Sequence, residues 1–265
     1  MKHETGQLSP AWPARAGFPP QDAVARTRTA LLWAVALSLL LAILPWLWPA
    51  AAWIAWPQVV VATLVHEFGH GIAALVSGGG FESLRVYADG SGVAMTRGSA
   101  GGMQSAWIAA GGPGMPPLLA LLLFVAARKQ TLARVTLGVL GMLLLVALVL
   151  WVRNLFAAGL VLVCAALASA VAWRASGMLV QAFTGFVAVQ LCLATLSRLG
   201  GLFQRGARTG AGELASDTMQ MAQGLGGPHW FWAALLVLFS LLVLALGLWV
   251  LWRSFGLRAE PPAAI

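Results

Sequence analysis

The chain has 265 residues, of which 60% are hydrophobic and only 9% are charged. A soluble domain carries roughly 25% charged residues, so this composition excludes a water-soluble globular fold and indicates an integral membrane protein. The net charge of +8 comes from basic residues scattered between apolar segments, which argues against nucleic-acid binding and for topology signals and contacts with anionic lipids.

The chain begins with a polar segment, residues 1–28, that contains four prolines and little hydrophobic periodicity. We expect a disordered cytoplasmic tail rather than a signal peptide, because the next apolar segment, 30–48, is longer than the apolar region of a typical signal peptide. At the other end, residues 254–265 are expected to form a disordered C-terminal stub. Residues 29–253 then make up a single membrane domain.

A membrane-spanning helix needs about 20 apolar residues. Seven apolar segments approach or reach this length: 30–48, 57–77, 104–126, 132–151, 154–173, 178–199 and 229–252. The third is interrupted by GGPGMPP, so it either crosses the membrane or folds back as a re-entrant segment. The sequence therefore predicts an all-α polytopic membrane protein with six or seven transmembrane helices.

The second apolar segment contains the sequence VHEFGHGIAAL, residues 65–75. Residues i and i+4 share one face of a helix, so His66 and His70 lie side by side and can supply two ligands to a zinc ion. Glu67 lies beside this face and can act as general base on a water activated by the zinc. Ionisable groups inside a membrane are costly and are functional candidates by default. A buried His–Glu pair without a metal is the alternative interpretation.

Residues 81–98, FESLRVYADGSGVAMTRG, contain apolar side chains separated by polar ones on both sides of Asp89 and Gly90. An Asp-Gly pair between two strand-like segments is a strong signal for a tight turn. The sequence therefore predicts a small β-hairpin directly after the segment with the histidines. The distribution of lysine and arginine favours a cytoplasmic N-terminus and a cytoplasmic hairpin, whether or not the third apolar segment crosses.

Glycine and proline bracket a polar segment, 200–228, before the last apolar segment. It predicts a short helix near 213–223, with Ser216 as a plausible N-cap. The third zinc ligand is sought here by elimination, because the other acidic residues lie in the tail, the hairpin or the stub, or serve as the base. Between Glu213 and Asp217 we choose Asp217, because a carboxylate beside an N-cap has a fixed orientation. Simple helix capping is the alternative role for Asp217, and the other candidates for the third ligand are Asn154 and His229.

The stretch HEFGHGIAALVSGG, followed by RVYADGSGVAMTRG and then by AAGGPGMPPLLALLL, resembles the site-2 protease family of membrane-embedded zinc metallopeptidases. The resemblance is closest to the compact bacterial branch of this family and covers most of residues 57–250. It departs from the family pattern at two points. The Asn of the family's AGPlaN motif is absent after Gly111-Gly112-Pro113, and the sequence contains no Asp-Gly pair beyond the hairpin to match the family's third ligand.

The resemblance implies helices that surround a zinc ion held by two His and one Asp, with a Glu as base. His66, His70 and Glu67 carry over directly to these roles. In the family, the hairpin is thought to pair with an extended substrate. This implies β-augmentation on the hairpin, with a substrate-binding segment at Arg85, Val86 and Tyr87.

The resulting hypothesis is an intramembrane zinc metalloendopeptidase with Zn²⁺ as cofactor and transmembrane or membrane-associated proteins as substrates. We expect it in a bacterial inner (cytoplasmic) membrane. A non-proteolytic zinc-holding or scaffold membrane protein on the same fold is the alternative. A transporter is a weaker third interpretation, since neither an inverted repeat nor a paired polar site is evident. The sequence predicts neither the identity of the substrate nor the oligomeric state.

Overall fold

The computed structural model describes residues 21–48, 50, 52–98 and 102–255. Within these residues, seven helices are long and apolar enough to cross a membrane. They are α1 (Gln21–Leu47), α2 (Ala52–Val76), α3 (Gly102–Ala127), α4 (Gln130–Leu150), α5 (Leu155–Arg174), α6 (Gly177–Arg198) and α8 (His229–Phe255). The predicted all-α polytopic fold is therefore confirmed.

The two terminal segments were expected to be disordered. Helix α1 begins within the predicted tail, so residues 21–28 are helical, and residues 1–20 lie outside the described part of the chain. Helix α8 extends to Phe255, and residues 256–265 of the predicted stub also lie outside it.

The third apolar segment forms one continuous helix, α3, although Pro113, Pro116 and Pro117 lie inside it. Proline removes a backbone donor and disfavours a helix interior in water, but neighbouring helices and side chains can satisfy the freed backbone groups of a membrane helix. Here the glycines let α3 approach α2 closely. A Cβ atom on Gly69 of α2 would lie 2.1 Å from the carbonyl oxygen of Gly111. The GGPGMPP sequence is thus a close-packing surface within a membrane-spanning helix.

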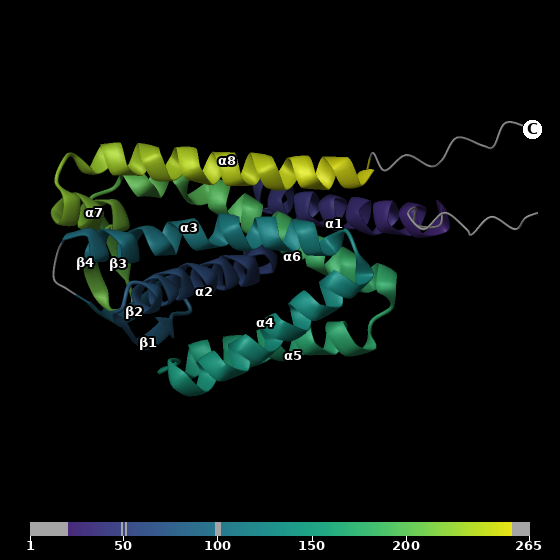
Figure 1. Ribbon diagram of the computed structural model, residues 1–265, viewed down its shortest axis with the longest axis horizontal. Helices are drawn as coiled ribbons and strands as arrows, with labels where there is room; N and C mark the ends of the chain where they lie inside the picture. Colours follow the sequence, from purple (N-terminus) through teal and green to yellow (C-terminus); the bar gives the residue numbers. More distant parts are fainter. Residues whose placement is uncertain (1–20, 49, 51, 99–101, 256–265) are drawn as a thin grey trace, which may run out of the picture.

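Helix α3 is the central contact of the bundle, because it packs against α2, α6 and α8, while α1 packs against α6 (Figure 1). A buried cluster joins α1, α2, α3, α6 and α8 and contains Leu31, Ala62, Phe124, Leu191 and Leu244. Helices α4 and α5 pack against each other and lie to one side of α2 (Figure 1). The half of α2 that contains His66, Glu67 and His70 lies beside the short elements described next.

The first hairpin consists of β1 (Gly80–Val86) and β2 (Gly92–Arg97), paired antiparallel as the sequence predicts. Gly90 in its turn has φ +86°, a left-handed conformation that glycine adopts without steric cost. Asp89 Oδ1 accepts hydrogen bonds from the hydroxyl and the backbone N–H of Ser91, at 2.7 and 2.9 Å. These hydrogen bonds hold the pKa of Asp89 below its usual value.

The outer edge of β1 is anchored to the connection between α4 and α5. Leu84 donates its backbone N–H to the Trp151 carbonyl at 2.7 Å and accepts from the N–H of Arg153 at 3.1 Å. Asn154 Nδ2 donates to the Val86 carbonyl at 2.7 Å. The hairpin therefore uses its first strand to attach to the helical bundle, which leaves β2 as its other edge.

A second hairpin, β3 (Gly206–Thr209) and β4 (Gly212–Ala215), follows the 3₁₀-helix η2 (Leu199–Phe203) and precedes the short helix α7 (Asp217–Leu225). The expected N-cap is confirmed, because the Ser216 side chain accepts a hydrogen bond from the backbone of α7. The second hairpin was not expected from the sequence. Its four-residue strands are too short to show a clear alternation of apolar side chains. Figure 1 shows both hairpins and α7 at the same end of the bundle.

Candidate metal and active site

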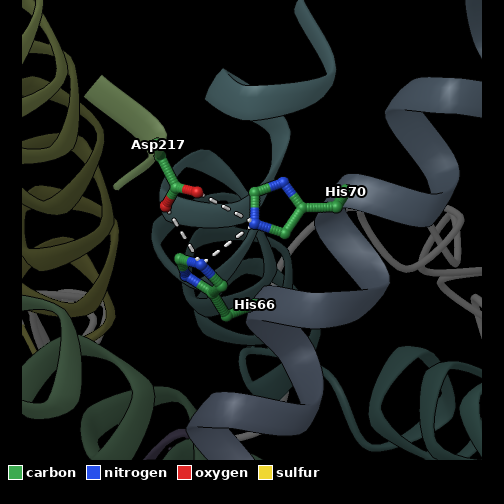
Figure 2. A group of neighbouring side chains, drawn as sticks. All are labelled: His66, His70 and Asp217. Carbon is green, nitrogen blue, oxygen red and sulfur yellow. Dashed lines mark hydrogen bonds and ion pairs between the residues drawn. The ribbon is translucent and has the colours of Figure 1, made fainter. Parts of the chain in front are cut away.

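Three side chains from distant parts of the sequence meet at the polar end of the bundle (Figure 2). His66 and His70 lie one turn apart on α2, and their Nε2 atoms are 3.2 Å apart. Asp217, the first residue of α7, directs Oδ2 to His66 Nε2 at 3.2 Å and Oδ1 to His70 Nε2 at 3.3 Å. These three residues are the group of possible metal ligands found among the described residues.

The dimensions of this triangle fit a zinc ion. Four ligands at ~2.0 Å from a tetrahedral zinc lie ~3.3 Å from one another. The two Nε2 atoms are 3.2 Å apart, and each has a different Asp217 oxygen at 3.2–3.3 Å; with one ligand atom taken from each residue, the three atoms lie within 4.8 Å of one another. Two imidazoles and one carboxylate form a donor set typical of catalytic zinc, in which the fourth position stays open for water or substrate. The residues present therefore fit the metal that the sequence predicts.

Helix α3 shapes the space in which the histidines lie. His70 Nδ1–H donates to the Ile108 carbonyl at 2.8 Å, which leaves Nε2 with its lone pair free for a ligand bond. Gly112 lies directly against both rings. A Cβ atom there would be 2.2 Å from His70 Nε2 and 2.7 Å from His66 Nε2, so any larger residue would enter the space that a metal needs.

Asp217 is held by the hydrogen bonds of its neighbours. The Thr218 hydroxyl donates to the Leu202 carbonyl of η2 at 2.7 Å, and Ser216 N–H donates to the Arg205 carbonyl at 3.1 Å. Burial acts to raise the pKa of Asp217, but the positive charge of His70 when it is protonated, together with a hydrogen bond and the charge of protonated His66, outweighs burial and lowers this pKa below its usual value. Asp217 is thus favoured in its anionic form, which is the form that binds metals.

Glu67 is buried, with 7% of its surface exposed, between α2 and β2. Ala94 of β2 lies beside its carboxylate and lines the same cavity. A Cβ atom on Gly92 would lie 2.7 Å from Glu67 Cγ, so the glycine provides the room for this side chain. The carboxylate therefore has a fixed position beside the histidine triangle.

A cavity of about 360 Å³ opens at these side chains, within the range of ~300–1,000 Å³ that ligand sites occupy. It is lined by His66, Glu67, His70 and Asp217, by β2, by both strands of the second hairpin, and by Arg198 at the end of α6. Arg198 Nη2 donates to the Thr63 hydroxyl at 2.7 Å, and Thr63 donates to the Gly90 carbonyl at 2.6 Å. This chain of bonds connects α6, α2 and the turn of the first hairpin.

The residues predicted to bind substrate lie on or beside β1. The Arg85 side chain is exposed, Val86 is buried with its carbonyl bonded to Asn154, and Tyr87 packs against Gly210 of the second hairpin. None of the three lines the cavity, whereas Gly92, Val93, Ala94 and Thr96 of β2 do. Substrate binding by Arg85, Val86 and Tyr87 stays a prediction.

The other candidates for the third ligand have different contacts. His229 Nε2 lies 3.2 Å from the Phe203 carbonyl, Asn154 bonds to the first hairpin, and exposed Glu213 pairs with Arg208 at 2.9 Å. The sequence analysis missed Gly112, Arg198 and the cavity-lining residues of β2. Arg198 had a usable signal, because it is a charged residue at the end of an apolar segment. Gly112 lies in the stretch that resembles a family motif and β2 in the predicted hairpin, but their contacts with the site depend on packing and could not be read from the sequence.

Comparison with known proteins gives one match. A family model described as Peptidase M50B-like matches residues 34–247, which includes the HExxH helix, both hairpins and Asp217. Searches of curated proteins and of solved structures found no match. The matched region covers most of the chain, and the chain therefore belongs to the Peptidase M50B-like family, within the site-2 proteases.

Proposed function

We propose that this chain is an intramembrane zinc metalloendopeptidase that hydrolyses peptide bonds of transmembrane or membrane-associated proteins. The observation that carries the proposal is the triangle of His66, His70 and Asp217, in which the two Nε2 atoms are 3.2 Å apart and each lies 3.2–3.3 Å from one oxygen of the Asp217 carboxylate. Membership of a peptidase family supports it. The distribution of lysine and arginine further supports an N-terminus in the cytoplasm, and the resemblance to the compact bacterial branch of the family supports a bacterial inner membrane.

His66, His70 and Asp217 would hold the metal. When bound, zinc supplies a Lewis acid that polarises the scissile carbonyl and activates a water molecule for attack. Glu67 is the proposed general base, because its carboxylate lines the same cavity as the two imidazoles. It accepts the proton of the attacking water and delivers it to the leaving amine. Gly92 and Ala94 of β2 line the same cavity as this carboxylate, and a Cβ atom on Gly92 would lie 2.9 Å from Glu67 Oε1.

The substrate is proposed to bind in an extended form along β2. Backbone groups of alternate residues in an antiparallel strand point to the same side. Gly92, Ala94 and Thr96 alternate along β2, so they direct their backbone groups to one side, and all three line the cavity together with Glu67. An extended peptide added there would pass beside the base and the metal ligands. A transmembrane substrate must therefore unwind locally before it is cut.

Cleavage of a designed membrane span tests this function. The span contains about 20 alanine and leucine residues with a central Gly-Pro pair that disfavours the helix, and it is reconstituted in liposomes with the enzyme. Wild type should cut it near the Gly-Pro pair. Glu67→Gln should keep zinc but lose about 10²–10⁴-fold in rate, the usual contribution of a general base.

Glu82→Gln is the matched control, because this exposed carboxylate pairs with Arg97 at 3.5 Å away from the cavity and should cut at the wild-type rate. Full activity of Glu67→Gln would contradict the assigned base. If wild type carries zinc but leaves every version of the span intact, with the Gly-Pro pair moved along it, the zinc-holding scaffold becomes the better interpretation.

A further inference from the structure

The second hairpin contacts the first one at its tip. Gly210 N–H donates to the Ser91 hydroxyl at 2.9 Å, and the ring of Tyr87 fills the space beside Gly210. A Cβ atom on Gly210 would lie 2.5 Å from this ring. The β3–β4 hairpin is thus fastened to the turn of the first hairpin, although the two belong to separate sheets.

The two hairpins also share the active-site cavity. Thr209 and Leu214 of the second hairpin line it together with β2. Side chains alternate between the two faces of a strand, and residues of paired strands share a face by register. Thr209 pairs with Gly212, two residues from Leu214, so Thr209 and Leu214 lie on the same face.

The other face of the second hairpin is polar. Arg208 and Glu213 are directly paired and form an exposed ion pair at 2.9 Å, and neither lines the cavity. The hairpin therefore has the ion pair on one face near its tip and Thr209 and Leu214 on the other face, while Gly206 and Ala215, paired at the base of the hairpin, also line the cavity. The Leu214 side chain is still 44% exposed, so it has apolar surface available for a ligand.

We propose that the β3–β4 hairpin is the second wall of the substrate cleft. An extended, apolar peptide segment lies between β2 and this hairpin, and Leu214 contacts a substrate side chain. The contacts of Gly210 with Tyr87 and Ser91 hold the wall closed over the segment. Since β4 leads through Ser216 directly into Asp217, closing of the wall also keeps the proposed third ligand in position. This inference rests on the proposed function and adds a binding element to it.

Site-specific photo-cross-linking tests the contact. A benzophenone side chain is introduced at Leu214, at Val93 of β2 as a reference, or at Glu213 as the control on the opposite face. Each is made in the Glu67→Gln background, so that the designed Ala/Leu span with a Gly-Pro pair remains uncut. Leu214 and Val93 should cross-link to the span, and Glu213 should give at least several-fold less product.

Each other outcome overturns part of the inference. If Val93 cross-links to the span and Leu214 does not, the β3–β4 hairpin is not a wall of the cleft. If Leu214 and Glu213 cross-link with equal yield, the proposed orientation of the hairpin is wrong. If neither Leu214 nor Val93 cross-links to the span, the substrate does not bind in this cleft. Cross-links from Leu214 and Val93 in a chain whose wild type never cuts the span would support the binding cleft and reject the proteolytic function, so the two failures are distinguishable.

A double-mutant cycle tests the fastening at Gly210. Gly210→Ala should force the hairpin away from the Tyr87 ring, so that amide hydrogen exchange across 206–215 becomes at least several-fold faster. Gly200→Ala is the matched control, because no atom lies within 4 Å of a Cβ atom there. In a Tyr87→Ala background, Gly210→Ala should have no further effect, since the ring is gone. Equal exchange in Gly210→Ala and Gly200→Ala, or an unchanged effect without Tyr87, would refute the fastening.

Discussion

At the scale of single residues, the proposed metal site depends on glycines that leave space as well as on the side chains that could bind the metal. The two imidazoles come from one helix, and their relative position follows from helical geometry. The space between them is preserved by Gly112 on the facing helix, where a Cβ atom would be 2.2 Å from His70 Nε2. Glu67 likewise needs Gly92 beside it. Two glycines therefore decide whether the ligands and the base can take up these positions.

The proposed ligands make a direct prediction about metal content. Purified wild type should carry about one zinc per chain, and His66→Ala or Asp217→Asn should lose most of it. His229→Ala and Glu213→Gln are matched controls of the same residue types, because neither side chain belongs to the triangle. Metal analysis by mass spectrometry gives the answer. Zinc that persists in both His66→Ala and Asp217→Asn would show that these residues do not hold it.

Gly112→Ala should lower zinc affinity by about 10–100-fold, the usual effect of disturbing the surroundings of metal ligands. The added methyl group would displace both imidazoles from their present positions. Gly114→Ala is the control on the same helix, where a Cβ atom meets only Phe239 at an ordinary 3.6 Å. Competition with a fluorescent zinc chelator measures both affinities. If the two variants bind zinc with equal affinity, the protein accommodates the added methyl group at position 112 without disturbing the zinc site.

At the scale of elements, the site is assembled from a long helix and short pieces that other elements hold in place. Helix α2 supplies two proposed ligands and the base, and α7 supplies Asp217. The first hairpin is attached by β1 to the α4–α5 connection, while the turn residue Gly90 is tied to Thr63. This arrangement keeps β2 beside the proposed ligands and base, where it lines the cavity.

The attachment of β1 can be weakened at one side chain. Asn154→Ala should destabilise the protein by about 1–3 kcal/mol, because it leaves the Val86 carbonyl without its side-chain donor in a partly buried site. Leu155→Ala is the neighbouring control, since Leu155 is 92% exposed and should have little effect. Thermal unfolding in detergent, followed by circular dichroism, compares them. If the two variants unfold alike, the bond to Val86 carries no stability.

At the scale of the whole molecule, the proposed zinc links two parts of the bundle. Its proposed ligands come from α2 and α7, and α3 packs against both of these helices. A metal that binds only the folded chain stabilises it by mass action, by ~2.7 kcal/mol when free zinc is about 100 times its Kd. Metal binding should therefore contribute to stability as well as to catalysis.

Removal of the metal should accordingly lower the unfolding temperature by several degrees. An excess of EDTA is expected to have this effect on wild type, and added zinc should reverse it. His66→Ala should unfold at the same temperature with and without the chelator, which controls for effects of EDTA on the detergent or the fold. A chelator effect of equal size in both proteins would contradict a metal link through His66.

The sequence by itself determined the membrane fold and half of the proposed site. Spans could be found because a bilayer demands about 20 apolar residues, and the side-by-side histidines because helical periodicity is local. The Asp89-Gly90 turn was equally local. Asp217 could be selected only by elimination among eight acidic residues, and its short distance to both histidines could not be derived from sequence patterns.

Only the tertiary structure decided which surfaces meet. It made the GGPGMPP segment a continuous helix, because close contact with α2 favours packing over a re-entrant turn. It directed β2 toward the cavity, because Trp151 and Arg153 occupy the edge of β1. It also brought the unexpected second hairpin to Tyr87 and Ser91. Such contacts join segments far apart in the chain, so they follow from the packing of the whole bundle and leave no periodic signal in the sequence.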